Sequence, residues 1–172
     1  ISGATSSTYT LTQSDVGTAI TVTASYTDAL GASESSTSAA TSAVANVNDA
    51  STVAISGTAT EDQVLTATVT DEDGATGTIT YTWARAGSAI SGATSSTYTL
   101  TQSDVGSAMT VTVTFTDDLS TSESATSAAT AAVTNVNDDP TGSVTITGTA
   151  QEDETLGIAT SLMGDEDGLG TF

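Results

Sequence analysis

Acidic side chains supply most of the chemistry that this sequence offers. Its 172 residues include 21 Asp and Glu, one basic residue and no His or Cys, for a formal net charge of −20. Oxygen-bearing side chains gather in two Asp-Glu-Asp-Gly loops, residues 71–74 and 165–168, and in two Asn-Val-Asn-Asp segments, residues 46–49 and 135–138. Calcium takes about six to eight oxygen ligands of these kinds. Because carboxylates packed together repel one another without a cation, we predict Ca2+ as a cofactor here.

The composition argues against most other functions. Without His or Cys the chain has no Ser-His or Cys-His nucleophile, thiolate zinc site or imidazole metal ligand. With Arg85 as its only basic residue, it has no cationic surface for phosphates, and its negative charge would repel nucleic acids. The apolar stretches are too short for membrane insertion. We therefore expect no enzyme and no nucleic-acid partner.

An internal repeat organises the chain. Residues 1–17 recur unchanged at residues 90–106, which is an offset of 90 − 1 = 89 residues. The Asn-Val-Asn-Asp segments have the same offset, 135 − 46 = 89. The predicted domains are therefore the C-terminal half of one repeat, residues 1–49; a complete repeat, residues 50–138; and the N-terminal half of the next, residues 139–172. They are called the first, central and last segments below.

The central segment is predicted to contain short antiparallel strands. In residues 108–116 apolar side chains alternate with Thr, which is typical of a strand with one buried face. Trp83 alternates with Ile79 and Tyr81, so we expect it in a core rather than on a sugar-binding surface. No stretch has a convincing helical period. The other expected strands are residues 52–55, a strand with Val64, Ala67 and Val69, residues 78–83, a strand with Tyr98 and Leu100, and an Ala- and Thr-rich stretch ending at Val133.

Two groups of residues carry a family resemblance. Trp83 followed by Leu-Thr-Gln-Ser-Asp-Val-Gly at residues 100–106 resembles an immunoglobulin-like domain without its cysteines. Asn-Val-Asn-Asp-Asp-Pro at residues 135–140, with a later Asp-x-Asp-Gly, resembles the junctions of cadherin-like repeats. Together they resemble the tandem Ig-like or cadherin-like repeats of giant type I-secreted, RTX-type bacterial surface adhesins. The resemblance implies an all-β fold of antiparallel β-sandwich repeats. The first junction continues with Ala50 and lacks the Pro, so its linker is expected to be looser.

The expected topology brings separate acidic segments to each junction. The turn after the first strand and the linker of one repeat should face the Asp-x-Asp-Gly loop of the next. Asp15 and Asp104 are expected to cap turns, Glu72 and Glu166 to face solvent, and Arg85 to pair with an acid. An alternative is that these acids merely solvate exposed turns; it stays open for Glu61 and Asp62, and a contribution of Asp117 or Asp118 stays open too. The predicted metal ligands are Asn48, Asp49, Asp71 and Asp73 at the first junction, and Glu61, Asp62, Asn137, Asp138, Asp139, Asp165 and Asp167 at the second.

The first and last segments each lack half of the strands of a sandwich. We expect inward-facing apolar side chains without cover, which soluble proteins avoid. Their completion, by covalent continuation or by a neighbouring chain, is therefore expected. The side chains concerned are Tyr9, Leu11, Ile20, Val22 and Tyr26 in the first segment, and Val144, Ile146 and Leu156 in the last.

These observations predict a structural spacer in an extracellular stalk or adhesin of the bacterial cell surface, made rigid by calcium at its junctions. Bound calcium would stabilise each repeat by mass action. The expected partners are neighbouring repeats of the same or an identical chain. One alternative is a subunit of a self-assembling filament or surface layer. Another is a ligand-binding adhesin domain, which the near-identity of the repeats disfavours.

Overall fold

Strands and short turns make up nearly all the regular structure of the chain. The computed structural model describes residues 1–171, so the final residue of the predicted last segment lies outside the described residues. The strands pair antiparallel, which confirms the predicted all-β fold. Within the described residues, no helix is long and apolar enough to cross a membrane.

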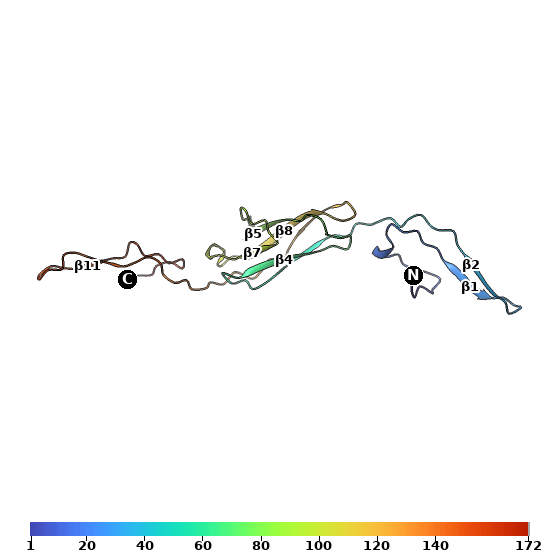
Figure 1. Cartoon of the computed structure of the whole chain (residues 1–172), viewed down its shortest axis with the longest axis horizontal. Helices are drawn as coiled ribbons and strands as arrows, with labels where there is room; N and C mark the ends of the chain where they lie inside the picture. Colours follow the sequence, from blue (N-terminus) through green and yellow to red (C-terminus); the bar gives the residue numbers. More distant parts are fainter. Residues whose placement is uncertain (172) are drawn as a thin grey trace. The chain divides into compact units, whose positions relative to one another are not determined.

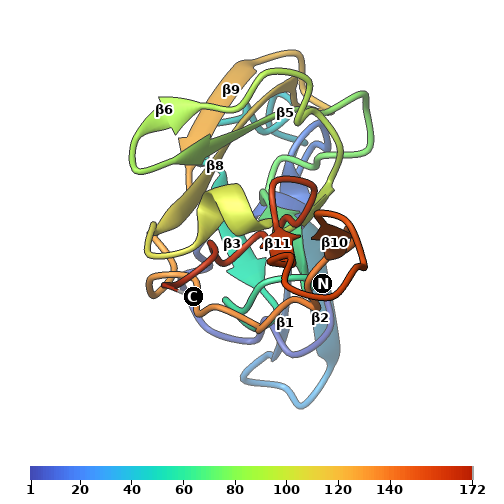
Figure 2. The ribbon, with the colours of Figure 1, turned by 90° about the vertical axis from the view of Figure 1, so that its left-hand side faces the viewer.

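The central segment contains two sheets, which face each other in Figures 1 and 2. The three-stranded sheet has the order β3-β4-β7, and the four-stranded sheet has the order β6-β5-β8-β9. A short 3-10 turn, η2, follows β7. The bounds are β3 Thr52–Ser56, β4 Val64–Thr70, β5 Thr80–Arg85, β6 Ser88–Ala89, β7 Thr97–Thr99, η2 Gln102–Asp104, β8 Met109–Thr116 and β9 Ser122–Thr126.

Side chains from both sheets form the core between them. On β8 every second side chain is buried and the intervening Thr side chains are not, as the sequence predicts. On β4 the alternation buries Leu65 and Ala67, whereas Val64 is 49% exposed. The buried apolar residues are Leu65, Ala67, Trp83, Leu100, Met109, Val111, Val113, Phe115 and Val133.

Trp83 is fully buried in this core, which confirms the prediction from its alternation. Its ring stacks on that of Tyr98, with centroids 5.7 Å apart. Its indole Nε1 donates a hydrogen bond to the Ser95 carbonyl at 2.9 Å. The polar edge of the ring is thus satisfied inside the protein, as burial of an indole requires.

The first and last segments contain few strands. The first has a 3-10 turn, η1 Gln13–Asp15, and a hairpin of β1 Thr23–Thr27 with β2 Ser33–Thr37. The last has β10 Thr145–Thr147 paired with β11 Gly157–Ala159. The side chains of β1 and β2 are all exposed. Of the side chains predicted to lack cover, Ile20 is only partly exposed and the other seven are exposed.

Close contacts divide the chain into two compact units. The first comprises residues 1–52, 69–79 and 114–124. The second comprises residues 53–68, 80–113 and those from 125 onward. We call the two Asn-Val-Asn-Asp segments, residues 46–49 and 135–138, the first and second linkers. Each linker lies in the same unit as the acidic loops that surround it.

Candidate metal sites

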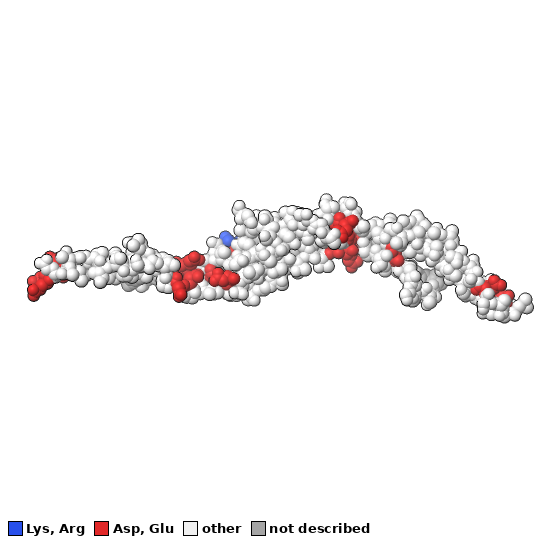
Figure 3. Space-filling model, in the orientation of Figure 1, with Lys and Arg blue, Asp and Glu red and all other residues white. Residues whose placement is uncertain are grey.

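Three carboxylates of the first unit form a compact cluster. Asp71 and Asp73 follow β4, and Asp117 follows β8. One carboxylate oxygen from each lies within 4.8 Å of the other two. Asp73 and Asp117 are each only 4% exposed. Acidic side chains gather in separate patches on the face of the molecule that Figure 3 shows.

Hydrogen bonds within the two loops fix the carboxylates of Asp71 and Asp117 through one oxygen of each. Asp71 Oδ1 accepts the Asp73 amide at 2.8 Å. Asp117 Oδ1 accepts the amides of Leu119 and Thr121 at 2.9 and 2.7 Å. Asp71 Oδ2 and Asp117 Oδ2 are buried and have no hydrogen-bond partner among residues 1–171. A buried oxygen without a partner is costly, so this arrangement favours a bound cation.

The electrostatics of the cluster point the same way. Burial raises the pKa of Asp71, and the nearby carboxylates of Glu123, Asp73 and Asp117 raise it further. A divalent cation would remove this repulsion. Calcium–oxygen distances of about 2.3–2.6 Å allow two ligands of one ion to lie up to about 5 Å apart. The spacing of the three oxygens therefore lies within the range that one shared cation can span.

The linker before the central segment is tied to the same loops. Asp73 Oδ2 accepts the Asp49 amide at 2.8 Å, and its Oδ1 accepts the Gln13 side-chain amide at 2.8 Å. Asn48 donates to Glu123 Oε1 at 2.8 Å. Asp49 was predicted as a metal ligand, but its carboxylate does not belong to the cluster of Asp71, Asp73 and Asp117. The linker is therefore held by hydrogen bonds to carboxylates.

Glu123 is a linker contact that the sequence did not indicate. Besides Asn48, it binds the backbone amide and the hydroxyl of Ser51, at 3.2 and 3.1 Å from Oε2. The hydrogen bond from Asn48 is the main cause that lowers the pKa of Glu123, followed by the Ser51 amide. Its position on β9 gives no motif, so only the packing of the linker could reveal it.

A second, more open cluster lies in the second unit. One carboxylate oxygen each from Glu61, Asp138 and Glu166 lies within 4.8 Å of the others. Glu61 is 2% exposed, and its Oε2 accepts the Val136 amide at 3.2 Å. Asp138 Oδ2 is buried and has no hydrogen-bond partner in the described part of the chain. Burial, followed by repulsion from Asp167, raises the pKa of Asp138. Glu166 is exposed, as expected, but its carboxylate belongs to the cluster, which we did not predict.

The remaining predicted ligands of the second junction surround this cluster. Asp165 Oδ1 accepts the Asp167 amide at 2.9 Å. Asp167 accepts the Asp138 amide at 2.9 Å and the Asn135 side chain at 2.6 Å, and these two bonds lower the pKa of Asp167. Asn137 donates to the Asp138 carbonyl at 3.1 Å. Four acidic residues predicted as ligands of this junction do not belong to the three-residue cluster: Asp62, Asp139, Asp165 and Asp167.

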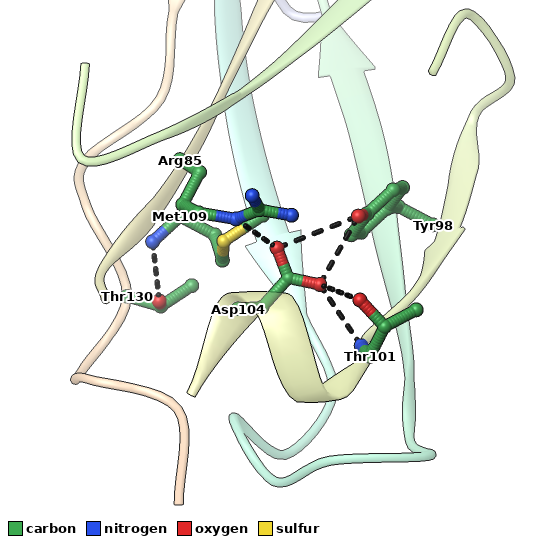
Figure 4. A network of polar contacts seen from close by, with 6 residues as sticks. All are labelled: Arg85, Tyr98, Thr101, Asp104, Met109 and Thr130. Atoms are coloured by element: carbon green, nitrogen blue, oxygen red, sulfur yellow. Dashed lines mark hydrogen bonds and ion pairs between the residues drawn. The ribbon is translucent and has the colours of Figure 1, made fainter. Parts of the chain in front are cut away.

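Asp15 and Asp104 cap turns, as predicted. Asp104 Oδ2 accepts the Thr101 amide at 2.9 Å and the Tyr98 hydroxyl at 3.1 Å (Figure 4). Its Oδ1 pairs with Arg85 Nε at 2.6 Å, which confirms the predicted ion pair. Burial alone would raise the pKa of Asp104, but the hydrogen bonds from Arg85 and Thr101 hold it below its usual value.

The fold and the site define a class: an all-β chain whose acidic clusters lie beside its linkers. Neither protein-family models, curated proteins nor solved structures give a significant match to the chain. The resemblance to Ig-like and cadherin-like repeats therefore rests on the sequence motifs.

Proposed function

We propose that this chain is a structural spacer of an extracellular bacterial stalk or adhesin, built of Ig-like or cadherin-like repeats and made rigid by calcium. The observation that carries the proposal is the buried cluster of Asp71, Asp73 and Asp117 beside the linker. Two of its buried oxygens have no hydrogen-bond partner among the described residues, and a bound cation would supply one. The family motifs add the extracellular, bacterial part of the proposal.

The proposed mechanism couples metal binding to linker order. Asp71, Asp73 and Asp117 would hold the ion, which would neutralise their repulsion and lock the two loops together. Asp73 also accepts the Asp49 amide, so fixing Asp73 fixes the linker. Glu61, Asp138 and Glu166 would play the corresponding part at the second linker. A rod in millimolar calcium and a looser chain without calcium would follow.

A calcium titration tests this proposal. Calorimetry should detect binding to the chain, and calcium should raise the melting temperature reported by the fluorescence of Trp83, the only Trp. Replacing both Asp71 and Asp117 by Asn should weaken binding strongly, because it removes the charges on the unpartnered oxygens. Glu72→Gln is the matched control, since Glu72 is exposed in the same loop and lies outside the cluster. Equal calcium affinity in the unaltered chain, the double Asn variant and Glu72→Gln would refute the proposal.

Self-assembly is the second candidate function. The apolar side chains of both flanking segments favour it: Val22 and Tyr26 are 64% and 60% exposed, and Ile146 and Ile158 are 74% and 69% exposed. Surfaces of this kind are normally covered. The last segment of one copy would then cover the first segment of another. Sedimentation over a range of concentrations tests this, and a monomer at all concentrations would contradict it.

A further inference from the structure

The two linkers share one pattern of direct hydrogen bonds, in which one carboxylate accepts a Gln side chain and a linker amide. At the first, the second Asp of the Asp-Glu-Asp-Gly loop, Asp73, accepts the Gln13 side chain and the Asp49 amide, both at 2.8 Å. At the second, Asp167 accepts the Gln102 side chain at 3.4 Å and the Asp138 amide at 2.9 Å. Each residue of the first set occupies the repeat position of its counterpart in the second.

We infer that Gln13 and Gln102 are recognition residues that fasten each repeat to the Asp-Glu-Asp-Gly loop of the repeat that follows. The partner surface is the carboxylate of the loop's second Asp, with one oxygen for the Gln side chain and the other for the linker amide. This inference goes beyond the proposed calcium function, because the contact joins the Gln side chain directly to the Asp carboxylate. We call this contact the Gln–Asp clasp.

The turn that carries each Gln is built to hold its backbone in place. In η1 the Thr12 and Asp15 side chains form a capping box, and Thr101 and Asp104 do the same in η2. The Gln carbonyls are engaged as well, since Val16 N lies 3.1 Å from Gln13 O, and the equivalent distance in η2 is 3.2 Å. With the backbone fixed, the Gln side chain is free to reach the next repeat.

The acceptor is equally fixed at both linkers. The Asp73 amide binds Asp71 Oδ1 at 2.8 Å, and the Asp167 amide binds Asp165 Oδ1 at 2.9 Å. Hydrogen bonds to an ionised carboxylate are stronger than those between neutral groups. The only basic side chain of the sequence, Arg85, is already paired with Asp104. A neutral amide such as Gln13 is therefore the donor that this composition offers.

The two clasps differ in how much they depend on Gln. Asp73 is 4% exposed, and among the described residues its Oδ1 accepts a hydrogen bond from Gln13 alone. Asp167 is exposed, and its Oδ1 also accepts Asn135 at 2.6 Å, a shorter contact than that of Gln102. We therefore expect replacement of Gln13 to loosen its linker more than replacement of Gln102 does.

Amide hydrogen exchange at Asp49, measured by NMR with excess EDTA, tests the inference without calcium. Gln13→Glu removes the donor and places a negative charge against Asp73, so the Asp49 amide should exchange about tenfold faster. Gln13→Leu, which adds no charge, should show a smaller increase. Ser14→Glu is the matched control, because Ser14 is exposed on the same turn and the added charge is the same; it should leave the exchange rate unchanged.

Two results would overturn the inference. One is an Asp49 exchange rate unchanged by both Gln13 substitutions. The other is an equal acceleration by Ser14→Glu, which would assign the effect to charge alone. Trp83 fluorescence confirms in each variant that the central segment stays folded, since Trp83 is buried there. A chain that fails to bind calcium would leave this measurement untouched, so the two proposals fail separately.

Discussion

The first and central segments share a stretch of sequence but differ in what they bury. Residues 1–17 and 90–106 are identical. Leu11 is nevertheless 50% exposed, whereas its counterpart Leu100 is fully buried. Further along the same alignment Val22 is 64% exposed and Val111 is fully buried. The difference lies in the presence of β4 and β5, which supply Leu65 and Trp83 to the core of the central segment alone.

Local conformation, in contrast, is the same in both segments. The 3-10 turns at residues 13–15 and 102–104 end with Val16 and Val105 at φ −54° and ψ of 135° and 134°. The central and last segments also agree in local conformation: Asp62 and Asp153, at equivalent turns, adopt φ of 64° and 66°. Turns therefore follow from their own residues, while burial depends on strands from elsewhere in the repeat.

The strongest test of this comparison replaces the same Leu in both segments. Leu100→Ala should cost the central segment about 2–5 kcal/mol, because it leaves a cavity in a fully buried site. Leu11→Ala should change the stability by less than about 0.5 kcal/mol, since Leu11 is half exposed. Urea unfolding followed by Trp83 fluorescence measures the first, and hydrogen exchange at Thr12 measures the second. Equal costs would show that a covered core also exists around Leu11.

A smaller effect is expected from the turn-capping acids. Asp104→Asn should cost about 2–3 kcal/mol, because it weakens charge-assisted hydrogen bonds in a buried site and leaves Arg85 unpaired. Asp15 has an equivalent bond from the Thr12 amide at 2.8 Å but no guanidinium partner, so Asp15→Asn should cost less. Exchange rates of the Thr101 and Thr12 amides give the two values. A larger loss at Asp15 would contradict the expectation.

The smallest expected effect is a pH dependence of the central segment. The pKa of Asp104 is lowered in the folded protein, so its stabilisation is present above the pKa of the unfolded chain. It should be lost as the pH falls below about 4 and through the folded value. Arg85→Met removes the largest of the interactions that lower this pKa and should flatten the dependence. Urea midpoints measured between neutral and acidic pH test this, and an unchanged slope in the variant would refute it.

The sequence predicts those features that depend on local pattern. The Thr alternation of residues 108–116 indicated β8, and the position of Trp83 indicated the core. The Asp-x-Asp-Gly motif led to Asp71 and Asp73, but Asp117 stayed open and Glu123 and Gln13 were missed. The contacts of these three residues arise where loops distant in sequence meet, as in the bond between Gln13 and Asp73, 60 positions apart. No local pattern encodes such a meeting.

The scarcity of basic residues has a consequence for proteolysis. A protease that cuts after Lys or Arg has a single bond to attack in this chain, between Arg85 and Ala86. Arg85 ends β5, its side chain is 32% exposed, and its guanidinium is held by the buried Asp104. Cleavage therefore requires the end of β5 to open. The rate at which trypsin divides the chain into two fragments thus reports the opening of a single strand, without any label.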